Sequence, residues 1–149
     1  MVQHVLMRRD SVSSLGRYND HIQREVDAYK AAFTWPDPAW SVDVRVLLAG
    51  LNKRLFEVGL TIGELERQSG LLDHNVASRF ASCVGRTPKA YRLAHQVALA
   101  KRLLQHEGLK EAPIYQLALA IGYGRHGDFS RMFKERVGCT SSQYRARVS

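Results

Sequence analysis

The chain has 149 residues, 45% of them hydrophobic, and a formal net charge of +8. Such a basic balance favours a polyanionic partner, nucleic acid above all. No apolar run is long enough to span a bilayer, and no charged-then-apolar leader opens the chain. These features exclude a membrane partner and predict a cytoplasmic, nucleoid-associated protein.

Catalytic and metal-binding side chains are not grouped along the chain. The six histidines are scattered without ligand spacing, and the two cysteines, Cys83 and Cys139, have no neighbouring His or Cys at metal spacing. No paired acids or activated cysteine accompany them. The sequence therefore predicts no metal, no cofactor and no enzyme activity.

The first 33 residues fall into two parts. Residues 1–17 lack a steady apolar period and contain Gly16 and three serines, so we expect a loose arm. Residues 18–33 fit a helix with one apolar side, formed by Ile22, Val26, Tyr29 and Phe33. We expect this helix to dock on the main domain. The alternative is a homodimer or partner-protein contact through residues 18–40.

A boundary is expected near residue 43. Pro36 and Pro38 break helical continuity there. Residues 1–40 hold five basic and five acidic side chains, so subtraction from the totals of 22 and 14 leaves 17 and 9 beyond them. The excess positive charge therefore lies in the second part of the chain, residues 44–149, and none of it in the arm and amphipathic helix of residues 1–43.

The second part begins with a helical apolar period from Val44 to Gly59. A first helix-turn-helix unit is then predicted over residues 60–86, with Thr61 as N-cap and Glu64 as its capping-box partner. A second unit is predicted over residues 113–137, because two apolar stripes flank a turn at Gly122. The fold class is therefore all-α.

The two units are copies of each other. Adding 53 carries Val76, Phe80, Val84, Gly85, Thr87 and Tyr91 onto Phe129, Phe133, Val137, Gly138, Thr140 and Tyr144. Adding 52 carries Ile62, Leu65 and Gly70 onto Ile114, Leu117 and Gly122. This internal repeat predicts two helix-turn-helix subdomains.

A long helix is expected to separate the copies, over about residues 88–107. Thr87 and Pro88 favour its start, as N-cap and first helical residue. About 20 residues rise roughly 30 Å, and one turn of B-DNA is about 34 Å. The spacer could thus hold two recognition helices in successive major grooves.

Candidate DNA contacts follow from the outward sides of the second helix in each copy. Base reading is predicted for Arg125, His126, Gly127, Asp128 and Arg131 in the second copy, and for His74, Asn75 and Ser78 in the first. Phosphate contacts are predicted for Lys134, Arg79, Arg86 and Arg145. The first copy is expected to be the weaker reader, since its outward side chains are short and Glu66 stands where the second copy has Ala118.

The second copy contains a long motif: Ile114-x-x-Leu117-Ala118-x-x-x-Gly122-Tyr123, then Phe129-Ser130-Arg131-x-Phe133-Lys134, Gly138-x-Thr140 and Tyr144-Arg145. This motif resembles the signature of AraC/XylS-type transcription regulators. Ser141 departs from it, since the family usually has proline there. The resemblance implies a transcription factor that binds double-stranded DNA, often an activator that contacts RNA polymerase. Two alternatives stay open: a partner-binding regulator with weak DNA reading, and the DNA-binding piece of a larger effector-sensing regulator.

Overall fold

The structure is a computed structural model that describes residues 2–33, 36–71 and 75–148, with the backbone alone over residues 2–15. All its regular elements are helical, which confirms the all-α class. The helices are α1 (Val2–Ala31), α2 (Val42–Arg54), α3 (Ile62–Gln68), α4 (Val76–Val84), α5 (Pro88–Gln105), α6 (Ile114–Ala120), α7 (His126–Val137) and α8 (Ser141–Val148), with a 3-10 turn, η1, at Glu107–Leu109. None of the described helices is long and apolar enough to cross a membrane.

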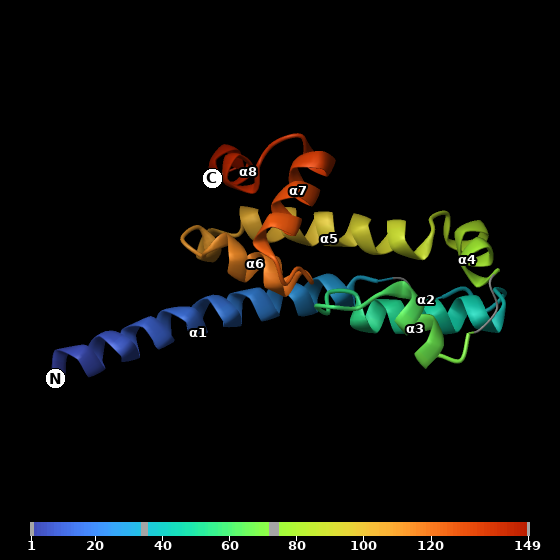
Figure 1. The fold of residues 1–149 in the computed structure, drawn as a ribbon, viewed down its shortest axis with the longest axis horizontal. Helices are drawn as coiled ribbons and strands as arrows, with labels where there is room; N and C mark the ends of the chain where they lie inside the picture. The colour runs from blue at the N-terminus through green and yellow to red at the C-terminus, as the bar shows by residue number, and fades with distance from the viewer. Residues whose placement is uncertain (1, 34–35, 72–74, 149) are drawn as a thin grey trace.

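Helix α5 is the rod on which the other helices are arranged (Figure 1). In this view α1 and α2 lie below the rod, α7 and α8 lie above it, and α4 lies at its N-terminal end. We call α3 and α4 the first lobe and α6 and α7 the second lobe. Buried side chains from both lobes and the rod, such as Phe80, Leu99 and Phe133, belong to one apolar core. The two lobes are therefore parts of one packed body.

The expectation of a loose arm over residues 1–17 is wrong. Helix α1 runs without a break from Val2 to Ala31, and its first turns extend beyond the rest of the protein (Figure 1). Serine and glycine lower helix propensity without forbidding a helix, and no proline interrupts this stretch. Once the docked half has formed its turns, each further residue adds one hydrogen bond, so the helix propagates.

The second half of α1 docks on α5, as expected for residues 18–33. Ile22 is buried, and the Tyr29 hydroxyl lies 2.5 Å from Nδ1 of His95. Glu25 pairs with Arg102 on the next turns of α5. This helix therefore covers the side of the rod that faces away from α7.

Helix α2 ends earlier than its apolar period indicated. It stops at Arg54, and Leu55 and Phe56 stay buried in the turn that follows. Gly59 then takes a φ of +81°, which favours glycine and directs the chain into α3. The apolar residues were correctly predicted as core, whereas their helical period did not reveal the turn.

Both predicted threonine caps are present. The Thr61 hydroxyl accepts a hydrogen bond from the Glu64 amide at 3.1 Å, and the Thr87 hydroxyl accepts one from the Ala90 amide at 3.2 Å. These bonds satisfy amides that a helix start leaves unpaired. The caps therefore define where α3 and α5 begin.

Arg92 fixes the first lobe to the rod. Its guanidinium donates to three carbonyl oxygens between α2 and α3: Leu55 at 3.0 Å, Leu60 at 2.7 Å and Glu57 at 2.8 Å. Burial lowers the pKa of Arg92 from its usual value. One turn further along α5, the buried Gln96 amide donates to the Ile121 carbonyl at 2.9 Å. Neighbouring turns of α5 thus hold both lobes in place.

Candidate nucleic-acid interface

Helix α7 has one buried side and one exposed side. Phe129, Met132 and Phe133 are buried, and the Phe129 ring packs 5.9 Å from that of Tyr123 in the preceding turn. That turn needs a glycine, because Gly122 has a φ of +106° and an added Cβ would lie 3.3 Å from the Phe56 carbonyl oxygen. The helix is therefore seated firmly, with a fixed outward side.

The outward side of α7 brings together all the candidate base-reading residues of the second copy. The exposed residues are Arg125, His126, Gly127, Asp128, Arg131 and Lys134. Nε2 of His126 lies 3.3 Å from the Ser130 hydroxyl, across one turn of the helix. Cationic and hydrogen-bonding groups thus occupy the first two turns, where a recognition helix meets base edges.

Helix α4 presents a less charged surface. Val76 and Phe80 are buried, while Asn75 and Ser78 are exposed beside each other. His74 lies outside the described residues. The Ser82 hydroxyl donates to the Ser78 carbonyl at 3.1 Å, as serine commonly does inside a helix. The exposed groups of α4 are therefore short and neutral.

Two of the four predicted phosphate contacts have other partners. Arg79 pairs with Asp43 of α2, and the Ser41 hydroxyl and Arg79 together lower the pKa of this carboxyl group. Nη1 of Arg145 donates to the Ala112 carbonyl at 2.7 Å. These two arginines hold helices together, which a sequence-based assignment from charge alone did not reveal. Lys134 and Arg86 remain exposed.

The arginines with described side chains divide into two groups. Internal hydrogen bonds or ion pairs engage Arg45, Arg54, Arg79, Arg92, Arg102 and Arg145. Within the described part, neither kind of bond engages the exposed Arg17, Arg24, Arg67, Arg86, Arg125, Arg131, Arg136 and Arg147. Three of these eight, Arg125, Arg131 and Arg136, belong to α7 or its N-cap. Helix α7 thus carries several guanidinium groups that are available to a ligand, and Arg86 adds one just before the start of the rod.

A family of helix-turn-helix domains matches residues 65–147, which is more than half of the chain. The chain belongs to the AraC-type helix-turn-helix family. The match covers most of the first lobe, all of the rod and the second lobe, and most of α8. It supports a DNA-binding transcriptional regulator and confirms the family expected from the signature.

Curated relatives carry names of the same kind. The chain is 32% identical over 85 residues to a Streptomyces antibioticus protein named as an AraC-like transcription regulator, covering 57% of this chain and 27% of that protein. It is 25% identical over 99 residues to LumQ of Photobacterium leiognathi, which is named as a transcriptional regulator. This match covers 66% of this chain and 39% of LumQ. The chain thus spans well under half the length of these relatives. No solved structure gives a significant match.

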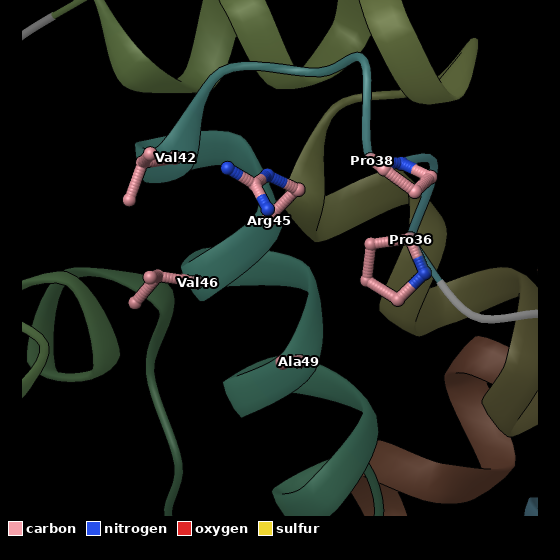
Figure 2. Close-up of a pocket in the computed structure, with 6 residues that line it drawn as sticks. All are labelled: Pro36, Pro38, Val42, Arg45, Val46 and Ala49. Carbon is pink, nitrogen blue, oxygen red and sulfur yellow. The ribbon is translucent and has the colours of Figure 1, made fainter.

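The AraC-type match leaves α1 and α2 outside it, and part of the surface of α2 is apolar. A hollow of about 370 Å³ is lined by Pro36, Pro38, Val42, Arg45, Val46 and Ala49. Figure 2 shows Val42 and Val46 on one side of α2, with the two prolines on the loop across from them. Val42 is 65% exposed and Val46 39% exposed. A second hollow of about 310 Å³, reaching the end of α1, shares Pro36 and Ala49 with the first.

Proposed function

We propose that this chain binds duplex DNA with α7 in one major groove and α4 in the next, and thereby regulates transcription. The observation that carries this proposal is the outward side of α7, where exposed arginines without internal partners sit on a firmly packed helix. The proposed role is binding, with residues 44–149 as the DNA-binding part and the nucleoid as its location.

The side chains of α7 suit different kinds of DNA contact. Arg131 can donate two hydrogen bonds to O6 and N7 of guanine, the commonest specific base contact. Gly127 brings the backbone close to the base edges, with Arg125, His126 and Asp128 around it. Lys134, further along the helix, is a point charge suited to a phosphate. The second lobe is therefore the main source of sequence specificity.

Helix α4 is proposed as the weaker reader. Asn75 can pair with adenine, but Ser78 is too short to reach far into a groove. Glu66 is half-buried at the position that matches the buried Ala118 in the second lobe. The first lobe is therefore expected to help position the protein on the DNA and to add little sequence specificity.

Alanine at both Asn75 and Ser78 should weaken operator binding less than fivefold, since short neutral side chains contribute little to discrimination. The measurement is a fluorescence anisotropy titration against the same operator used for Arg131→Ala. A loss that exceeds the one caused by Arg131→Ala would make the first lobe the main reader.

Selection from a random duplex pool at physiological salt tests the proposed function. One asymmetric site about two helical turns long is expected, because a single chain presents two different recognition helices. Enrichment of a half-site alone would reduce the first lobe to a clamp on the backbone. If no sequence is enriched, sequence-specific binding is excluded.

The apolar surface of α2 favours a second function, contact with RNA polymerase. Arg45 lines the first hollow, Lys30 and Lys53 line the second, and neither lining includes an acidic side chain among the described residues. An acidic segment with apolar side chains fits such a groove by charge and by burial of Val42 and Val46. Helix α2, which lines the groove, lies on the opposite side of the rod from α7 (Figure 1), so a polymerase segment could reach it while α7 is bound to DNA.

Val46→Asp should weaken binding to purified RNA polymerase at least tenfold, because the new carboxylate would face an acidic segment of the partner and lose its hydration there. Val148→Asp is the matched control, since Val148 is 40% exposed and lies on α8. Operator affinity should stay unchanged in both variants. Equal polymerase binding by wild type and both variants would exclude the groove as the contact, and loss of a concentration-dependent dimer in Val46→Asp would assign the groove to a second copy.

A further inference from the structure

A crevice separates the two lobes, and α5 forms its floor. One part, a hollow of about 480 Å³, is lined by Arg86, Ala90, Leu93, Ala94, Val97 and Arg136. The adjoining part, about 450 Å³, shares Leu93 and reaches Lys89, Thr61 and Tyr123. We call the two parts together the inter-lobe crevice. Its floor has short or half-buried side chains, so a ligand can approach the rod closely.

The two ends of this floor carry uncommitted arginines. Arg86 precedes the Thr87 cap at the start of the rod, and Arg136 lies in the last turn of α7. Both are exposed, and within the described residues neither forms a hydrogen bond or ion pair. The sequence interpretation missed Arg136, because a helical wheel puts it beside the buried Phe129 and Met132. Only the packing of α7 on the rod turns it towards the crevice.

Positive charges act on titratable groups at and beside the crevice. Burial lowers the pKa of His95, and the charge of Arg86 lowers it further. The pKa of Tyr123 is raised by burial and, to a smaller extent, by the charge of Asp128, while the charges of Arg92 and Arg136 act to lower it. Among the residues that the structure describes, no acidic side chain lines either part of the crevice. The N-terminal end of α5 adds its partial positive charge beside Arg86.

We propose that Arg86 and Arg136 together hold the phosphodiester backbone of the DNA segment that lies between the two half-sites. This inference rests on the proposed function, since duplex DNA must bind both lobes for that segment to cross the crevice. A phosphate on either strand there would meet two exposed guanidinium groups at the edge of an apolar floor. The contact adds affinity and fixes register without reading bases.

The double variant Arg86→Ala/Arg136→Ala tests this contact, with Arg17→Ala/Arg24→Ala as the control. The control removes the same two charges from exposed positions on α1, on the side of the rod away from α7. Each phosphate contact contributes about 0.9 to the slope of log K against log salt concentration. The crevice variant should therefore lower that slope by about 1.8, whereas the control should leave it close to the wild-type value.

A second arm places uncharged methylphosphonate linkages in the selected operator, only between the half-sites. These linkages should weaken wild-type and control binding, but leave the crevice variant unaffected because its contact is already lost. If the linkages weaken the crevice variant as much as the wild type, or if its salt slope equals that of the control, the inter-lobe contact is excluded. If the wild type selects no operator, the proposed sequence-specific DNA binding is itself excluded.

Discussion

Arg131→Ala is expected to reduce operator affinity by about 1–3 kcal/mol, or about 5- to 150-fold, and to relax specificity at one guanine. The side chain is exposed on α7 and has no hydrogen bond or ion pair within the described residues, so its removal leaves the packing of the helix intact. Titration of the selected operator and its three variants at that base pair measures both effects.

Arg24→Ala serves as the control for charge in this experiment, because Arg24 is exposed on α1. Its affinity should match that of the wild type within twofold. A loss in Arg131→Ala that is equal for all four base pairs would identify Arg131 as a phosphate contact, and the base-reading role would then pass to the first turn of α7.

Arg92→Ala is expected to lower the free energy of unfolding by about 3 kcal/mol, because it leaves the Leu55, Glu57 and Leu60 carbonyls without their charged donor. For a chain of this size the melting temperature should fall by roughly 6–12 °C. Differential scanning calorimetry measures both quantities.

Arg92→Lys separates charge from geometry at this position. A lysine keeps the positive charge but lacks the planar fork that reaches three carbonyls, so an intermediate loss is expected. Thermal stability equal to wild type in Arg92→Ala would mean that the α2–α3 connection is held by core packing alone. The orientation of the first lobe would then not depend on this residue.

Local signals in the sequence were sufficient for the fold class and for most helix starts. The repeat offsets of 52 and 53 residues identified two copies, and the caps at Thr61 and Thr87 depend only on neighbours three residues away. The loose arm was mispredicted because a serine-rich stretch is a weak signal that a continuing helix overrides.

The roles of individual arginines could not be predicted in the same way. Arg79 meets Asp43 36 residues earlier, and Arg145 meets Ala112 33 residues earlier. No periodicity links such positions, so the sequence does not distinguish an arginine that holds helices together from one that is available to bind phosphate. The outward direction of Arg131 was predictable, because it follows from the period of a single helix. Its contact with a base stays a prediction.

Between Pro88 and Gln105 the rod contains no further proline and no glycine, so it has no hinge. A stiff helix transmits rotation as well as separation, and Arg92 and Gln96 lock the two lobes to adjacent turns of it. On DNA, one additional base pair between half-sites turns the far half-site by roughly 35° about the duplex axis. Neither lobe can follow that rotation independently. The protein would therefore bind best when the two half-sites have one particular rotation relative to each other about the duplex axis. With any other spacing, the DNA would have to twist before both lobes could bind.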